Sequence, residues 1–494
     1  MRERITFIHS PEDGVDPAEL VLEPARLKAP AIQAAREDRL TAALDELPSH
    51  VSRLLQDFRT LHVGSVSTEP YQTIEPYAAR LSPGLHVSYS LLKEGEPDLE
   101  PQKLCELLQA FGSLDCMSRE AFTSVASKND KNTPHDVHYF YQLLDHSHLI
   151  LKTYADVCGD NEECRSRARE LNDASSLEFA YDADKPVAKI TGFWPFKERT
   201  LDITSSDGRR TEVGIMARGS PPSMEQHDIG LGGITLVLGD SKRPSPTLFK
   251  FAERHRSMEQ SFQATFNQPT GLHPAMRISL SGSQAPAEDC RSYAFLTLPK
   301  TIFVDRYQLH DDLFMASKNL TALRHASVPV DLEAPAYTTK TWGSNILLEL
   351  APPSTTQEEW TAEVPLHLRY LEPSATGERE IHVAYPVVFW ACAAEQGTNF
   401  AINPFDKVGL GYDDLFDDDT VYWHVTPQPA SESDGRLVSS ITVPVVDEKA
   451  ASWVGAGTAA VVGLGFLWVL WQLVRAQTNS DREARAAKVE KKSR

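Results

Sequence analysis

Several features that mark common classes of protein are missing from this sequence. It contains no GxSxG motif, P-loop, protein-kinase signature or HExxH pair, so none of these enzyme classes is indicated. No repeat of the solenoid kind is present. Basic residues are also scarce, because 49 Lys and Arg face 69 Asp and Glu, for a formal net charge of −20. This acidic balance argues against binding to nucleic-acid phosphates.

The N-terminal end lacks the apolar run of a normal signal peptide, although it begins with basic residues. A long uncharged run occurs only near the other end, at Trp453–Val474. At ~1.5 Å per helical residue this run is about 33 Å long, enough to cross a ~30 Å hydrocarbon core. We therefore predict a transmembrane helix over residues 453–474, with Trp453, Trp468 and Trp471 toward the membrane surfaces.

The flanks of this run predict its orientation. From Arg475 to Arg494, basic residues outnumber acidic ones by seven to three. The positive-inside rule then predicts a basic cytosolic tail over 475–494 and a luminal location for residues 1–450. A tail-anchored protein facing the cytosol is the alternative, since a luminal chain would have to cross the membrane without a cleavable signal.

Lys491 and Lys492 stand third and fourth from the end of this tail. The position is typical of the dilysine signal that returns membrane proteins to the endoplasmic reticulum, which a receptor reads. A basic tail contacting lipid phosphates is the alternative. Within the run, Gly455, Ala459 and Gly463 recur every fourth residue and predict close packing against another transmembrane helix. The alternative is composition alone, because glycine is frequent in such helices.

The six cysteines leave disulfide pairing open, because an even set of six allows 15 full pairings. Cys158 and Cys164, in CGDNEEC, are close enough in sequence to form a candidate disulfide. Free thiols in a cytosolic chain are the alternative. One sequon, Asn319-Leu320-Thr321, makes Asn319 a candidate N-glycosylation site, whereas Asn132-Thr133-Pro134 does not qualify.

Hydrophobic periodicity divides the remaining chain into three predicted regions. Residues 1–172 form an α+β region, and 173–265 a β-rich region with a connecting helix. Residues 266–447 form an all-β block with the turn-separated short strands of a β-sandwich. Within the first two regions we predict strands at Arg2–His9 and His86–Leu92, helices over 31–60, 102–114, 137–158 and 245–262, and a hairpin joining 201–204 to 211–216 with Asp207-Gly208 in its turn. The predicted fold is thus a mainly β ectodomain with one C-terminal membrane helix.

Two clusters carry side chains that bind metals in other proteins. The aspartates between Asp413 and Asp419 suggest a divalent cation with sugar-nucleotide phosphates, because hard cations prefer carboxylate oxygens. An acidic surface loop is the interpretation we favour. His135, His138, Asp145, His146 and His148 form a second cluster, but no four-ligand set with structural zinc spacing is visible. We therefore expect ordinary surface or core histidines.

The C-terminal block resembles the PIG-X family, whose fungal members are the PBN-type proteins of the endoplasmic reticulum. The segments that carry the resemblance are CRSYAFLTLPKTIFVDRYQL (290–309), DLEAPAY (331–337), VPLHLRYLEP (364–373), IHVAYPVVFWAC (381–392) and the terminal span. Residues 1–265 look like the extension of the fungal form.

The resemblance implies a non-catalytic subunit of GPI mannosyltransferase I, which adds the first mannose to the GPI precursor on the luminal face. The expected partner is the multi-span catalytic subunit, which uses dolichol-phosphate-mannose. No cofactor, metal or catalytic residue is carried over. Fungal relatives also imply a broader role as a luminal folding factor, which is one alternative. A metal-dependent glycosyltransferase using Asp413–Asp419 is the other.

Overall fold

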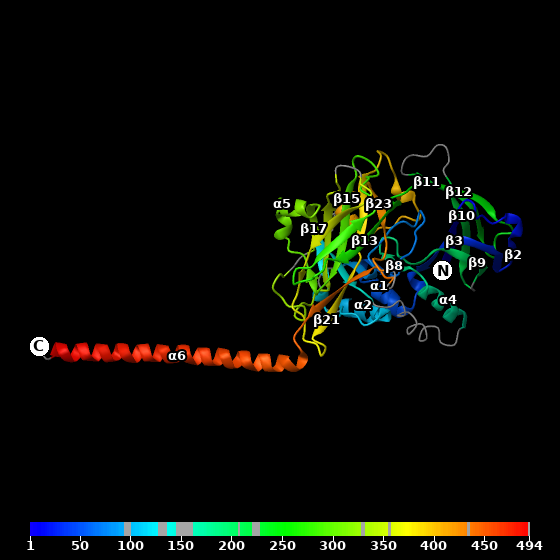
Figure 1. Cartoon of the computed structure of the whole chain (residues 1–494). Helices are drawn as coiled ribbons and strands as arrows, with labels where there is room; N and C mark the ends of the chain where they lie inside the picture. The colour runs from blue at the N-terminus through cyan, green and yellow to red at the C-terminus, as the bar shows by residue number, and fades with distance from the viewer. Residues whose placement is uncertain are drawn as a thin grey trace. The chain divides into compact units, whose positions relative to one another are not determined.

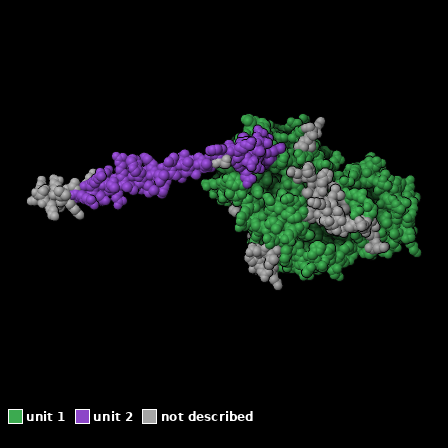
Figure 2. All heavy atoms as spheres, turned by 90° about the horizontal axis from the view of Figure 1, so that it is seen from below, with its two compact units in different colours: residues 1–370, 382–441 green, residues 371–381, 442–494 purple. Residues whose placement is uncertain are grey.

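A computed structural model describes residues 1–92, 100–126, 136–144, 162–205, 208–219, 228–327, 331–353, 357–431 and 435–492. Strands make up 46% of it and helices 20%, which confirms the predicted mainly β fold with one C-terminal apolar helix (Figure 1). The chain forms two compact units (Figure 2). The larger contains residues 1–370 and 382–441, and the smaller contains 371–381 and 442–494.

The N-terminal half of the larger unit builds one twelve-stranded sheet, in the order β12-β11-β10-β1-β3-β9-β8-β4-β5-β7-β6, with β2 paired to β3. Its strands are β1 (Arg2–His9), β2 (Val21–Glu23), β3 (Arg26–Ala43), β4 (Phe58–Val66), β5 (Gly84–Leu91), β6 (Thr123–Ala126), β7 (Asp136–Gln142), β8 (Ser176–Asp182), β9 (Val187–Thr204), β10 (Arg210–Gly219), β11 (Asp228–Val237) and β12 (Ser245–Ala252). The helices α1 (Ser49–Leu55), α2 (Glu100–Leu108) and α4 (Glu162–Asn172) lie between these strands in the chain.

The long pair β3 and β9 bends this sheet back onto itself. Their register shifts between Ala29 and Ile32 and again between Ala34 and Arg36. Such bulges turn a strand, and Pro30 lies where no ladder hydrogen bond is required of it. Leu27 and Leu201, beyond the bend, therefore share one core cluster with residues of β1, β10 and β11.

The C-terminal half forms an eight-stranded sheet, in the order β17-β18-β15-β22-β23-β13-β14-β19. Its strands are β13 (His255–Phe266), β14 (Ala275–Leu280), β15 (Arg291–Pro299), β17 (Leu320–Ala326), β18 (Gly343–Leu350), β19 (Trp360–Pro365), β22 (Val387–Ala393) and β23 (Thr420–Pro427). Two short ribbons pair β16 (Ile302–Phe303) with β20 (His367–Leu368) and β21 (Glu378–Ala384) with β24 (Val438–Pro444). Helix α5 (Asp312–Ser317) precedes β17.

The two outer strands of this sheet approach each other. The Glu363 main-chain N–H donates to the Lys318 carbonyl at 2.9 Å, and the Asn319 side chain donates to the Thr361 carbonyl at 2.7 Å. An ion pair of 2.7 Å joins the Lys318 ammonium to the Glu363 carboxylate. The sheet is therefore rolled, and both outer strands are partly protected from pairing with other chains.

Residues 399–419, here called the bridging segment, connect the two large sheets. Tyr412 packs with Phe295 and Phe389 on one face of the eight-stranded sheet. Toward the twelve-stranded sheet, the Tyr139 hydroxyl donates to the Asp414 carboxylate at 2.9 Å, and the Arg39 guanidinium donates to the Pro404 carbonyl. The sheets are thus held together through loop residues as well as through strands.

Several predicted elements are confirmed. The strand at 2–9 is β1 and the strand at 86–92 is β5, and the helix predicted at 102–114 is present as α2 and the 3-10 helix Gln109–Phe111, ending before residue 112. The turn-separated short strands predicted within 266–447 are present as β14 to β24. The three-part division of residues 1–447 stays a prediction.

Three predicted helices and the hairpin are wrong in whole or in part. Within residues 31–60, only α1 and the short 3-10 helix Leu44–Glu46 are helical, whereas 31–43 belong to β3 and 58–60 to β4. Residues 245–262 form β12 and the first part of β13. The first residues of the predicted helix 137–158 are β7, and 145–158 lie outside the described residues. The hairpin does not form, since β1 and β3 lie between β9 and β10 in the sheet.

Tertiary pairing explains the error at β3. Its charged run resembles the solvent face of a helix, but Arg36 pairs with Asp38 at 2.6 Å, and Arg39 pairs with Glu37 at 3.0 Å. The strand is bonded along both edges, to β1 and β9. Pairing with strands distant in sequence has overridden local periodicity, which is a weak guide when tertiary contacts compete with it.

Candidate functional site

The C-terminal helix α6 (Glu448–Lys492) contains the one candidate membrane span among the described residues, Glu448–Arg482. Its most apolar window has a mean hydropathy of 1.8, and none of that window is buried within the chain. Large side chains such as Phe466 and Trp468 are exposed along it. An apolar helix with no protein cover fits a single-pass membrane protein. Lys491 and Lys492 lie in α6, and their side chains lie outside the described part of the chain.

The small-residue stripe lies on this uncovered helix. A Cβ atom added to Gly455 or Gly463 would meet no atom within 4 Å, and the same holds for Gly457 and Gly465. Ala459 is also exposed. The stripe is therefore open to another helix, because a Cβ atom at these glycines meets no part of the chain beyond the adjacent helix backbone.

Two disulfides are present among the described residues, Cys105–Cys116 and Cys290–Cys392. The first closes the turn after α2, and the second joins the start of β15 to its neighbour β22. All four cysteines are buried. The cysteine spacings left these pairings open, because each partner is chosen by the fold. The predicted pair of Cys158 and Cys164 stays a prediction, since Cys158 and the Cys164 side chain lie outside the described part.

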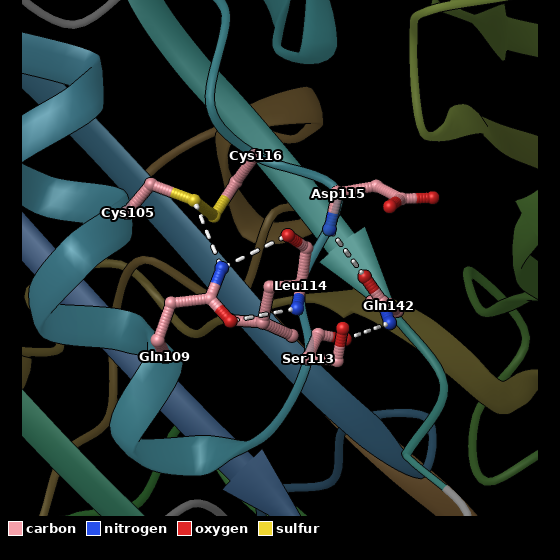
Figure 3. Close-up of a disulfide and its surroundings, with 7 residues drawn as sticks. All are labelled: Cys105, Gln109, Ser113, Leu114, Asp115, Cys116 and Gln142. Atoms are coloured by element: carbon pink, nitrogen blue, oxygen red, sulfur yellow. Dashed lines mark hydrogen bonds between the residues drawn. A yellow bond between two sulfur atoms is a disulfide. The ribbon is translucent and has the colours of Figure 1, made fainter.

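Side-chain amides organise the loop that the first disulfide closes (Figure 3). The Gln109 amide donates to the Leu114 carbonyl at 3.0 Å and accepts from the Leu114 N–H at 3.2 Å. From β7, Gln142 accepts from the Asp115 N–H at 3.1 Å and donates to the Ser113 carbonyl at 3.0 Å. These bonds satisfy the loop backbone and hold the loop against the sheet.

The sequon lies in the turn between α5 and β17. Asn319 is exposed and has a φ of 55°, a left-handed conformation that asparagine tolerates. Its side-chain nitrogen, the atom to which a glycan would be joined, donates to the Thr361 carbonyl at 2.7 Å. A glycosylated amide keeps one N–H, so this bond and a glycan are compatible.

Asn319→Gln is expected to remove one N-linked glycan, because an exposed turn gives the transferase access to the sequon. The measurement is electrophoretic mobility of the full chain before and after endoglycosidase treatment. Thr321→Ala should have the same effect while leaving the Asn319 amide in place, and Thr321→Ser should keep the glycan. Equal mobility of wild type and Asn319→Gln would show that the site is not used.

Two of the aspartates between Asp413 and Asp419, for which metal binding was the less favoured interpretation, make internal contacts. An Asp413 oxygen accepts the Gly409 N–H at 2.7 Å, and Asp414 accepts from the Tyr139 hydroxyl. Burial, and after it the neighbouring Asp414, raises the pKa of Asp413 to about 6. Asp417 and Asp419 are exposed. In the described ranges, no group of three or more His, Cys, Asp or Glu side chains is placed to hold a metal ion.

Two charged residues of the bridging segment form ion pairs that were not predicted from the sequence. The Glu178 carboxylate lies 3.2 Å from the Lys407 ammonium and 2.7 Å from a ring nitrogen of His62. Burial acts to raise the pKa of Glu178, but Lys407 and His62 outweigh it and lower the pKa. Arg254 pairs with Asp406 at 3.1 Å. Each is a single charge far in sequence from its partner, so no local pattern could have indicated them.

Four histidines are buried among the described residues: His9, His138, His255 and His424. Of the predicted His cluster, the structure describes only His138, which is buried with its ring 4.9 Å from that of Tyr89. A pair that sequence analysis missed lies beside the bridging segment. The Nδ1 atom of His255 is 3.1 Å from Nε2 of His424, and Nε2 of His255 is 3.0 Å from the Lys407 carbonyl.

The hydrogen-bond partners indicate which ring nitrogen of each histidine carries a hydrogen atom. Because the Lys407 carbonyl only accepts, His255 carries its hydrogen on Nε2 and accepts at Nδ1 from His424. A further proton on His255 Nδ1 would face the N–H of His424. Burial accordingly lowers the pKa of His255 to about 3, although the bond to Lys407 acts in the opposite direction. Burial and then His255 lower the pKa of His424 well below its usual value.

The histidine pair makes stability fall in acid. Below pH 6.5 the unfolded histidines bind protons that the folded pair does not, so stability is present above pH 6.5 and is lost as pH falls, at about 1.4 kcal/mol per pH unit for each histidine. Asp413 opposes this, since its folded pKa is raised. The test measures unfolding midpoints in mild detergent between pH 4.5 and 7.5. As the pH falls, the midpoint should decrease less in His255→Gln/His424→Gln than in the wild type, and more in Asp413→Asn. Unchanged slopes in both variants would contradict this assignment.

This chain is similar to known proteins over nearly its whole length. Residues 269–474 match the PIG-X / PBN1 family. The chain is 47% identical over 502 residues to Protein pbn1 of Neurospora crassa, covering 99% of each chain. It is 46% identical to Protein PBN1 of Gibberella zeae, covering 98% of this chain and 97% of the relative. Protein pbn1 of Emericella nidulans is 37% identical, with 96% and 95% covered.

The family match and the folded sheet do not have the same limits. The match begins at residue 269, after β13, yet β13 lies between β23 and β14 inside the eight-stranded sheet. The matched residues alone would therefore lack an internal strand of that sheet. The full-length relatives extend the similarity through β13 and the twelve-stranded sheet.

Proposed function

Because this chain belongs to the PIG-X / PBN1 family, we propose that it is the non-catalytic subunit of GPI mannosyltransferase I that binds and stabilises the multi-span catalytic subunit. Family membership supports a role in GPI-anchor biosynthesis at the endoplasmic reticulum. The observation that carries the proposal is similarity over 99% of the chain to a family member. The uncovered apolar helix α6 supplies the membrane attachment such a role requires.

The proposed orientation places residues 1–447 in the lumen and the end of the chain in the cytosol. Two buried disulfides support it, because disulfides persist in oxidising compartments and are rare in the cytosol. The exposed sequon at Asn319 and the basic residues after position 474 support the same orientation.

The proposed mechanism is binding linkage. A subunit that binds the folded catalytic partner and not its unfolded form stabilises the partner by RT ln(1 + [L]/Kd), about 2.7 kcal/mol when its concentration is a hundred times Kd. The proposed contacts are the α6 stripe and a face or edge of the C-terminal sheet. In this proposal the chain itself catalyses no reaction.

The test combines co-purification with depletion. The tagged full chain should co-purify with the mannosyltransferase catalytic subunit in mild detergent, and depletion should lower that subunit's abundance without lowering its messenger RNA. No association together with a normal level would overturn the proposal. Depletion that lowers many unrelated membrane proteins equally would favour the broader folding factor instead.

Gly455→Ile/Gly463→Ile is expected to lower recovery of the catalytic subunit about tenfold, because each 1.4 kcal/mol of lost helix packing is a factor of ten. Gly457→Ile/Gly465→Ile is the matched control. It adds the same side chains to glycines that are equally open, each lying about 160° around the helix from the stripe glycine two residues before it. Equal recovery with both variants would remove the stripe from the proposed interface.

A further inference from the structure

Four large apolar side chains are exposed around the short ribbon of β16 and β20. The exposed fractions are 56% for Leu272, 66% for Tyr307, 56% for Tyr337 and 68% for Tyr370. We call these four residues the β20 patch. Three of them are tyrosines, whose rings are apolar and whose hydroxyl groups are polar. Such residues are enriched where a protein surface meets lipid headgroups.

Hydrogen bonds bring the segments of the β20 patch together from distant parts of the sequence. The Leu272 carbonyl accepts from the Leu368 N–H in β20 at 3.0 Å. The Tyr370 carbonyl accepts from the Ala336 N–H at 2.9 Å, which places Tyr337 beside Tyr370 in the fold. The patch is therefore built by the folded ribbon and its neighbours.

The remaining member is tied to the same ribbon through its neighbour in sequence. A side-chain oxygen of Gln308, the residue after Tyr307, lies 3.2 Å from Nε2 of His367 in β20. The exposed Arg306 guanidinium lies 5.2 Å from the Tyr307 ring centroid. An exposed cation over an exposed aromatic ring suits a surface that carries phosphate groups next to apolar chains. Further along, α5 exposes Leu313 to 85%.

The covalent chain limits how far Tyr370 lies from the membrane helix. Tyr370 is four residues before Ser374, a stretch that spans at most about 14 Å. The Glu448 N–H, at the first residue of α6, donates to the Ser374 carbonyl at 3.1 Å. From Glu448, five helical residues at ~1.5 Å each reach Trp453. Covalent connectivity therefore keeps Tyr370 close to the first residue of α6.

We propose that the β20 patch rests in the headgroup layer of the bilayer that holds α6, as a second membrane contact of this chain. The patch orients the folded portion on the membrane surface and presents its neighbouring loops at a constant height. A luminal loop of a protein partner is the competing occupant. The covalent closeness of Tyr370 to α6, the three tyrosines and the exposed Arg306 favour lipid.

The test measures membrane depth in the full chain, reconstituted alone into phosphatidylcholine nanodiscs. A nitroxide is attached to p-acetylphenylalanine placed at position 370, 307 or 248. Position 248 is the matched control, because Leu248 on β12 is as exposed as Tyr370, at 68%. Collision rates with oxygen, which concentrates in lipid, are compared with those of a water-soluble nickel chelate. We expect a severalfold higher ratio of oxygen to nickel collisions at 370 and 307 than at 248.

Equal ratios at the three positions would overturn the proposal. It would also be overturned if 370 and 307 became protected from both reagents only after the co-purifying membrane partner was added, since the patch would then bind protein. The circular dichroism spectrum of each labelled chain is compared with that of the unlabelled chain. Matching spectra show that the labelled chain is folded, so equal collision ratios can then be interpreted.

Discussion

Replacing Cys290 and Cys392 with alanine is expected to lower the free energy of unfolding by about 4.7 kcal/mol. The two residues are 102 positions apart in the sequence. In the loop-entropy account, a cross-link closing a loop of ~100 residues removes about this much freedom from the unfolded chain. The loss is a large part of the ~5–15 kcal/mol that stabilises an ordinary domain. We expect the variant to accumulate poorly and to be cleaved readily by proteases.

The measurement is denaturant-induced unfolding of the full chain in mild detergent without reductant. Cys105→Ala/Cys116→Ala is the matched control, because it also removes one buried disulfide. That disulfide joins cysteines only 11 residues apart in the sequence. For a loop of ~15 residues the expected loss is about 3 kcal/mol. If the first variant were no less stable than the second, loop length would not explain the role of Cys290–Cys392.

Tyr412→Ala is expected to cost about 4 kcal/mol and to loosen the bridging segment. The residue is fully buried. Its ring centroid lies 5.0 Å from that of Phe389 and 5.6 Å from that of Phe295, and its hydroxyl donates to the Arg80 carbonyl at 3.0 Å. Removing a buried aromatic ring leaves a cavity, and such losses are about 3–5 kcal/mol.

Tyr412→Phe separates the ring from the hydroxyl group. It keeps the packing and removes one hydrogen bond, so the expected loss is about 1 kcal/mol. Limited proteolysis should show earlier cleavage within residues 399–419 in Tyr412→Ala than in Tyr412→Phe. If the two variants lost equal stability, ring packing would not be what holds the bridging segment between the sheets.

The sequence alone determined the elements whose signal lies within one short stretch. The apolar run after Glu448 needed only its length and lack of charge to predict the membrane helix. Strands such as β14 and β15 carry alternation or β-branched and aromatic residues between turn residues, which is enough to identify them. Family resemblance likewise rested on short segments within residues 290–392, and the full-length relatives confirm it.

Only the tertiary structure decided features that depend on partners distant in the chain. Residues 31–43 became β3 because β1 and β9 bond to both of its edges, and residues 245–262 were divided between two sheets. Cys290 meets Cys392 because β15 lies beside β22. Asp413, which resembled a metal ligand, accepts a main-chain hydrogen bond inside the fold. Local periodicity reports which face of a segment is apolar, whereas strand pairing, disulfide choice and the burial of a charge depend on which distant segment covers that face.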